Sequence, residues 1–171
     1  CERGTWTHAF LQHVDLSGPC DEPDLRRQLD ALIAAGRLTR DEAAIIDLES
    51  IAWFFAQPAG RALRQARQTV MRETPFVLGV DPARYQPGAL RQSPGDVLVT
   101  RGMIDCLYRT DAGLVVLDWK TDLLTPDDVA DRAAFYRPQL DIYAAAASAL
   151  FDLPVATRRL VFLTPRRVVD V

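Results

Sequence analysis

The sequence predicts an α/β fold in which helices flank a mixed central sheet, with a helical part at the N-terminus. Two observations support this class: apolar residues keep helical spacing through the first part of the chain, and short extended apolar runs separated by turn residues follow. With 171 residues, of which 49% are apolar, the chain can bury one sizeable core but not two. We expect a single domain over residues 1–171, with a helical part at about 1–66 and a core at about 67–171.

Helical spacing of apolar residues marks four stretches of the N-terminal part: residues 4–14, 25–36, 40–57 and 61–66. Thr5 or Thr7 is available to cap the first helix, and Gly36 is placed to end the second. Thr39 and Glu42 form the pattern of a capping box before the third helix. We expect this third helix to run without a break to its end.

Extended apolar runs mark the expected strands, around residues 70–78 and over 97–108, 114–119 and 159–163, the last being the final strand. Residues 81–96 are rich in Pro and Gly and predict a surface loop, and residues 110–113 predict a hairpin turn. Thr125 and Pro126 begin a helix with proline at its first position. Pro138 is expected to open a further helix that runs to Leu150.

The charge balance argues against a free-standing, sequence-independent DNA-binding protein, because such proteins are normally basic. The net charge here is −3, from 20 basic and 23 acidic residues. No uninterrupted apolar stretch approaches the roughly 20 residues of a membrane span, and the N-terminus lacks the order of a signal peptide. We expect a cytoplasmic protein with no membrane partner.

Three cysteines, Cys1, Cys20 and Cys106, form no close pair in the sequence. Their odd number argues against a disulfide framework, so we expect reduced thiols. Three also fall short of the four thiolates usual for an iron–sulfur cluster, and we expect no such cluster. The chain opens with Cys1 rather than methionine, which indicates a piece of a longer protein.

Lys120 is the only lysine in the chain, since every other basic residue is arginine. It follows Asp118 and Trp119 at the end of the apolar run 114–117. Arginine is a planar fork that stays charged, whereas lysine is a compact point charge whose pKa its surroundings can lower. A site that steers an attacking water and neutralises charge at one point has reason to keep lysine. The alternative is a surface lysine retained by chance.

The predicted hairpin brings two acids together. A turn centred on Asp111 and Ala112 places Asp105 opposite Asp118, and Lys120 then shares their face. Two carboxylates this close repel each other unless a cation lies between them, and hard oxygen ligands suit Mg²⁺ or Mn²⁺. A bulge at the turn would separate the two faces. The alternative is a pair of solvated strand acids with lysine as their partner, although aspartate is depleted in strands.

Four motifs in this order resemble the RecB-type nuclease domain of the PD-(D/E)xK superfamily, which ends the AddA and RecB helicase–nucleases. They are residues 4–8 (GTWTH), 102–105 (GMID), 118–121 (DWKT) and 136–143 (YRPQLDIY). The resemblance extends from residue 4 to the last strand. The missing four-cysteine cluster makes the chain more similar to the AddA and RecB branch than to the AddB branch. No Walker-type loop is present, so ATP-driven unwinding is not expected of this segment.

The resemblance implies a role for each matching residue. The implied metal ligands are His8, Asp105, Asp118 and the backbone carbonyl of Trp119, and the implied catalytic residues are Asp105, Asp118, Lys120, Gln139 and Tyr143. Lys120 would orient and polarise the attacking water. Gln139 and Tyr143 lie four positions apart on one helix face, and Tyr136 lies a further turn back if the helix extends that far.

Other candidates are interpreted as structural or solvated. Glu73, in the segment 73–76, also resembles a family segment but is interpreted as structural. His13 matches no motif and is expected to face solvent. Glu49 could approach the site from the third helix, but we expect it on a solvated face.

The resemblance implies an Mg²⁺-dependent deoxyribonuclease, with Mn²⁺ as a substitute and exonuclease action expected, in double-strand break repair and recombination. The implied partners are DNA, as a single strand delivered by a helicase, the rest of an AddA- or RecB-like polypeptide and its partner subunit. The acidic net charge fits a domain that acts within such a complex. The competing class is a catalytically silent DNA-binding or scaffolding module of the same fold. A stand-alone resolvase would not explain the motif that ends at His8.

Overall fold

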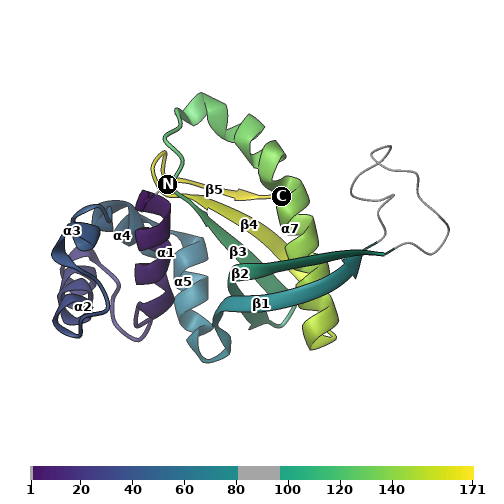
Figure 1. The fold of residues 1–171 in the computed structure, drawn as a ribbon, viewed down its shortest axis with the longest axis horizontal. Helices are drawn as coiled ribbons and strands as arrows, with labels where there is room; N and C mark the ends of the chain where they lie inside the picture. Colours follow the sequence, from purple (N-terminus) through teal and green to yellow (C-terminus); the bar gives the residue numbers. More distant parts are fainter. Residues whose placement is uncertain (1, 81–96) are drawn as a thin grey trace.

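The computed structural model describes residues 2–80 and 97–171, and the loop predicted at 81–96 lies outside the described residues. The described residues form one five-stranded sheet in the order β1-β2-β3-β4-β5. Only β3 and β4 pair in parallel, and the other neighbouring strands are antiparallel. The N-terminal helices cover one face of the sheet, and the long helix α7 lies against the other (Figure 1). The predicted α/β class with a mixed sheet is confirmed.

The N-terminal part contains these elements: α1 Glu2–His13, α2 Glu22–Ala34, α3 Arg40–Ala44, α4 Leu48–Ala56, α5 Pro58–Gln65 and the short 3₁₀ helix η1 Arg67–Thr69. The capping box of Thr39 and Glu42 is present, and Gly36 has a left-handed φ of +67° just after α2. The cap predicted at Thr5 or Thr7 is wrong, because α1 begins at Glu2 and both threonines lie inside it.

The third helix was predicted to be continuous, and this prediction is wrong. The chain leaves α3 after Ala44 and starts α4 at Leu48. The cause is Asp47, whose carboxylate accepts hydrogen bonds from the Ser50 backbone N–H at 3.0 Å and the Ser50 hydroxyl at 2.7 Å. An aspartate bonded in this way caps a new helix N-terminus instead of continuing the old helix.

The rest of the chain contains β1 Met71–Val80, β2 Leu98–Thr110, β3 Gly113–Lys120, the 3₁₀ helix η2 Pro126–Asp128, α7 Val129–Phe151, β4 Val155–Phe162 and β5 Arg167–Asp170. The helix start predicted at Pro138 is wrong, because this proline lies inside α7. The helix continues since buried residues anchor it on both sides of the proline, among them Ala133 and Leu140. The expected final strand is followed by β5, after a turn in which Arg166 has a φ of +53° without any glycine.

Alternate residues of β3 enter two different cores. Val115 and Leu117 join the core formed with the N-terminal helices, while Leu114 and Val116 join the core formed with α7. Every residue of β3 except Lys120 is buried, as expected for a central strand covered on both faces. The strand therefore carries its last residues to a place where both helical layers can reach them.

The predicted hairpin register is confirmed over the paired residues. Thr110 pairs with Gly113, and the ladder runs without a slip to the pair of Cys106 and Leu117. The irregularity near the turn lies on the other side of β3, facing β4, between Leu114 and Val115. The next step of this register is Asp105 opposite Asp118.

Within residues 2–80 and 97–171, no helix combines the length and apolarity needed to cross a bilayer. Two cysteines belong to the described part, Cys20 and Cys106, and both are free and buried. Burial raises the pKa of the Cys20 thiol to about 11 and that of Cys106 to about 12. Both thiols are therefore protonated at neutral pH, and the expected absence of an iron–sulfur cluster stays a prediction.

Gly60 allows close packing of α5 on α4. A Cβ atom at this position would lie 2.2 Å from the carbonyl oxygen of Phe54 and 2.5 Å from the Cα of Phe55. Since backbone atoms cannot move aside cheaply, we expect Gly60→Ala to lower the free energy of unfolding by about 3 kcal/mol in urea denaturation. Gly36→Asn is the control, because its site is open and asparagine tolerates a left-handed φ. An equal loss in both variants would contradict this prediction.

Candidate active site

The candidate site lies where β2 and β3 stop pairing. Asp105 is 9% exposed and Asp118 is 1% exposed, so both carboxyl groups are almost fully buried. Asp105 Oδ2 accepts the Trp119 backbone N–H at 2.9 Å. A side-chain oxygen thus takes the place of a strand carbonyl at the end of the ladder, and it holds Asp105 against the Asp118-Trp119-Lys120 segment.

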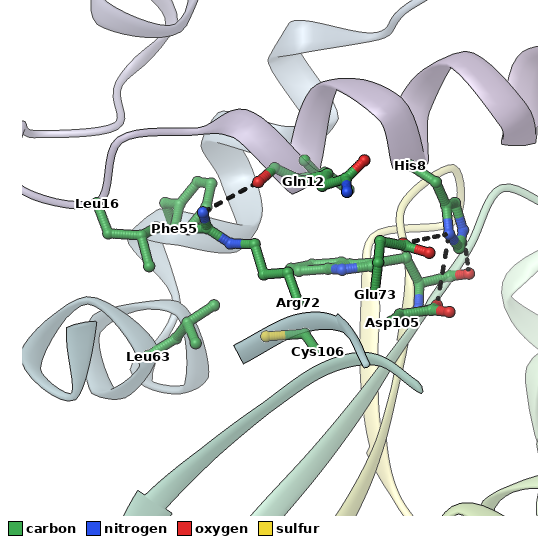
Figure 2. A pocket seen from close by; sticks show the side chains of 11 residues that line it. His8, Gln12, Leu16, Phe55, Leu63, Arg72, Glu73, Asp105 and Cys106 are labelled. Carbon is green, nitrogen blue, oxygen red and sulfur yellow. Dashed lines mark hydrogen bonds and ion pairs between the residues drawn. The ribbon is translucent and has the colours of Figure 1, made fainter. Parts of the chain in front are cut away.

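His8 reaches the same place from α1, although 111 positions separate it from Trp119. Its Nε2 lies 3.1 Å from the Trp119 carbonyl oxygen, and its Nδ1 lies 3.6 Å from Asp105 Oδ2 and 3.9 Å from Glu73 Oε1 (Figure 2). The helix can approach this closely because Gly4 has no side chain: a Cβ there would lie 3.2 Å from Thr121 Oγ1. The Gly-Thr-x-x-His motif is therefore a packing motif as well as a source of histidine.

Glu73 is the residue that the sequence analysis missed. It had been interpreted as structural, but with His8 and Asp105 it forms a group whose ligand atoms all lie within 4.8 Å of one another. Its φ of +47° is left-handed, which is rare for a non-glycine residue and marks local strain in β1. The available signal was an acid in a strand that pairs with the strand of Asp105.

Lys120 lies on the α7 side of the site. Its Nζ is 2.6 Å from Asp118 Oδ2 and donates a hydrogen bond to Gln139 Oε1 at 3.0 Å. Gln139 Nε2 in turn donates to the Tyr143 hydroxyl at 2.7 Å. The same ammonium lies 3.9 Å from the centroid of the Tyr136 ring. The lysine is therefore fixed from several sides, with a side chain only 12% exposed.

The structure thus brings together every site residue that the sequence analysis named, although their catalytic and ligand roles stay predictions. The Trp119 carbonyl contacts His8 Nε2. The remaining expectations concern residues outside the site. His13 is exposed, and Glu49 forms an ion pair with Arg166 at 2.8 Å with a side chain 69% exposed.

Burial controls the electrostatics of the acids. Burial raises the pKa of Asp105 well above its usual value, and the neighbouring Asp118 carboxylate raises it further. Burial also raises the pKa of Asp118, although the Lys120 ammonium opposes this shift. Burial raises the pKa of Glu73 as well. Three carboxyl groups are therefore held where negative charge is unfavourable unless a cation compensates it.

These shifts predict a pH-dependent stability cost. A carboxyl group whose pKa is raised in the folded state binds more protons folded than unfolded, so stability falls as pH rises from the unfolded pKa to the folded one. Each unit by which the pKa is raised costs about 1.4 kcal/mol above that window. In chelator we therefore expect Asp105→Asn to be more stable than the wild type at pH 8, with a gap that closes as the pH falls towards 4. Urea titrations at both pH values check this, and a gap that is constant with pH would contradict it.

The residues present fit a divalent cation. The two nitrogens of His8 face a carbonyl and two carboxylates, all of which are acceptors. The buried Asp118 Oδ2 accepts no hydrogen bond of acceptable angle within the described residues, despite its ion pair with Lys120. Carboxylate oxygens with one imidazole form a donor set suited to Mg²⁺ or Mn²⁺.

The family model described as the PD-(D/E)XK nuclease superfamily matches residues 2–169. The chain belongs to the PD-(D/E)XK nuclease superfamily. This PD-(D/E)XK domain therefore has the fold that its motifs predicted, and the resemblance stated from the sequence is confirmed.

Several bacterial proteins named as subunits of an ATP-dependent helicase/nuclease, of the AddA type, are similar to this PD-(D/E)XK domain. The Moorella thermoacetica protein is 37% identical over 163 residues, which cover 95% of this chain and 11% of that protein. The Pelotomaculum thermopropionicum protein is 36% identical over 167 residues, covering 96% and 13%. The Desulforudis audaxviator protein is 40% identical over 157 residues, covering 92% and 13%. The chain thus spans 11–13% of the length of these relatives.

A solved crystal structure also aligns with 99% of this PD-(D/E)XK domain and 74% of its own chain. The TM-score is 0.43 and the sequence identity is 17%, so this likeness supports no further conclusion.

Proposed function

We propose that the domain is a metal-dependent deoxyribonuclease that hydrolyses DNA phosphodiester bonds with Mg²⁺, for which Mn²⁺ can substitute. The observation that carries this proposal is the meeting of two buried carboxyl groups, a histidine and the only lysine of the chain at one end of β3. A stable core has no need for buried acids with raised pKa values, since they weaken the fold. Such a group is expected where chemistry requires it.

The residues that would hold the ion are His8, Asp105, Asp118 and the Trp119 carbonyl, to which the structure adds Glu73 as a candidate. When bound, the ion would stabilise negative charge on the phosphate and lower the pKa of a coordinated water. The protein's own contribution is to fix the oxygen ligands before the ion arrives. The Trp119 N–H bond to Asp105 does this for one of them.

Lys120 is proposed to orient the attacking water and to neutralise charge at the phosphate. Its Nζ is held by Asp118, by Gln139 and by the face of the Tyr136 ring. Gln139 and Tyr143 are proposed to position this ammonium, because their own hydrogen bond fixes the amide that contacts it. Burial raises the pKa of Tyr143 to about 12, so this hydroxyl stays protonated at working pH.

The relatives named as helicase/nuclease subunits support a wider context for the domain. We propose that residues 1–171 form a single nuclease domain of a longer cytoplasmic AddA- or RecB-like polypeptide, without an iron–sulfur cluster. A helicase part and a partner subunit would deliver a single DNA strand for exonucleolytic cleavage during double-strand break repair and recombination. The shared core of the N-terminal helices and the sheet supports one domain, with a helical part at about 1–66 and a nuclease core at about 67–171.

Cleavage of end-labelled single-stranded DNA by the purified chain tests the nuclease proposal. Products are expected with Mg²⁺ or Mn²⁺ and none with a chelator. The competing proposal, a silent DNA-binding or scaffolding module, predicts DNA binding without cleavage under any of these conditions. The converging acids and Lys120 favour the nuclease, because a silent module needs none of them.

A further inference from the structure

An exposed aromatic ring lies next to the candidate site on α7. Phe135, Gln139 and Tyr143 are spaced four positions apart, so they form one stripe along the helix. Gln139 and Tyr143 belong to the hydrogen-bonded group around Lys120. Phe135, one turn closer to the N-terminus of α7, is instead 69% exposed. A large apolar ring that faces solvent beside a polar site indicates contact with a ligand.

The Phe135 ring is supported on its inner side. It packs edge-on against Tyr136 with centroids 5.3 Å apart, and the Arg132 guanidinium lies 5.5 Å from its centroid. Tyr136 is itself fixed, because its hydroxyl donates to Asp122 at 3.2 Å and its ring lies under the Lys120 ammonium. The exposed ring is therefore a supported platform whose position is tied to that of Lys120.

The charges around this platform favour a base over a phosphate. Arg132 has a partner already, since its Nε lies 3.7 Å from Asp122. Asp131, one turn before Phe135 on the same stripe, is exposed and would repel a phosphate. What the platform offers is an aromatic face, and aromatic faces bind unstacked nucleobases with little preference for sequence.

We propose that Phe135 stacks on a base of a single DNA strand and so positions a neighbouring phosphate at the Lys120 site. This inference rests on the proposed nuclease function. Four residues of helix separate Phe135 from Gln139, which is about 6 Å along the axis. At roughly 3.4 Å per nucleotide, the stacked base lies one or two nucleotides from the reacting phosphate. Bases inside a duplex are already stacked, so the platform selects single strands.

Fluorescence of Phe135→Trp tests this inference without any cleavage. The variant is titrated in chelator with an octamer of thymidylate and with an abasic octamer of the same charge. Leu150→Trp is the matched control, because Leu150 is also exposed on α7 but lies near its other end. Relative to the wild type, the emission added at position 135 should be quenched by the thymidylate octamer and much less by the abasic one. The emission added at position 150 should respond to neither.

Affinity gives the second readout. Phe135→Ala should raise the Kd for the thymidylate octamer about tenfold, while Leu150→Ala should leave it unchanged. Equal quenching by both octamers, or wild-type affinity of Phe135→Ala, would overturn the stacking proposal, and stronger quenching by a blunt duplex would overturn its single-strand selectivity. Quenching in a wild-type background that never cleaves DNA would support stacking and reject the nuclease. Cleavage with no quenching at position 135 would do the reverse.

Discussion

Asp118→Ala is expected to abolish metal-dependent DNA cleavage, with a loss on the order of 10³-fold or more, while the fold survives. Asp118 is the most buried acid of the site, its Oδ2 accepts no well-formed hydrogen bond within the described residues, and Lys120 depends on it for an ion pair. Burial raises its pKa, so its removal also relieves an electrostatic cost of folding. The measurement is the rate of single-strand cleavage at saturating Mn²⁺, with circular dichroism to verify the fold.

Asp118→Asn and Asp141→Ala complete this experiment. The asparagine variant keeps the shape of the side chain and should be as inactive as the alanine variant, which separates loss of charge from loss of packing. Asp141 is also on the α7 side, but its ion pair is with Arg158 outside the site. Asp141→Ala should therefore keep near-normal cleavage, and activity retained by both Asp118 variants would reject the proposed role.

Lys120→Arg is expected to lose on the order of 100-fold in cleavage despite keeping a positive charge. The ammonium fits within 2.6 Å of Asp118 Oδ2, 3.0 Å of Gln139 Oε1 and 3.9 Å of the Tyr136 ring centroid. A planar guanidinium is larger and cannot occupy the same point. Lys120→Ala should lose at least as much. Turnover of both variants at saturating Mg²⁺ is the measurement.

Metal affinity distinguishes a positioning defect from a binding defect in these lysine variants. A cation is not a metal ligand, so Mn²⁺ affinity should stay near that of the wild type in both. Arg158→Lys is the control for an arginine–lysine exchange outside the site, and it should be fully active. Near-normal cleavage by Lys120→Arg would mean that the lysine is only a surface charge.

The hairpin that carries the two acids was predictable because its information is local. Residues 110–113 fix the turn, and a strand period of two then fixes which residues share a face. The sequence did not reveal that pairing ends at Cys106 and Leu117, or that the Asp105 carboxylate accepts the Trp119 N–H. That detail depends on the third dimension of the site.

Two errors in the helices have opposite causes. The break before Leu48 was missed because apolar spacing continued across it, whereas the hydrogen bonds of Asp47 favoured a new helix start. The start at Pro138 was predicted because proline removes a backbone donor, whereas packing of α7 on the sheet outweighed that cost. Local propensity was overridden by packing in one case, and periodicity by capping in the other.

The site itself was only partly predictable. His8 was placed in it by resemblance alone, because 111 positions separate it from Trp119 and no local pattern links them. Glu73 was missed for the same reason: its approach to His8 depends on the pairing of β1 with β2 and on a left-handed backbone. The exposed face of Phe135 was likewise hidden within a helical pattern that predicted only a buried stripe.

Calorimetric titration of the purified chain with Mn²⁺ tests the proposed metal site most directly. The wild type should bind Mn²⁺, and the double variant Asp105→Ala, Asp118→Ala should lose this binding while it remains folded. Equal Mn²⁺ binding by the wild type and the folded double variant would show that these carboxylates do not hold the ion, and the proposed metal-dependent mechanism would then be wrong.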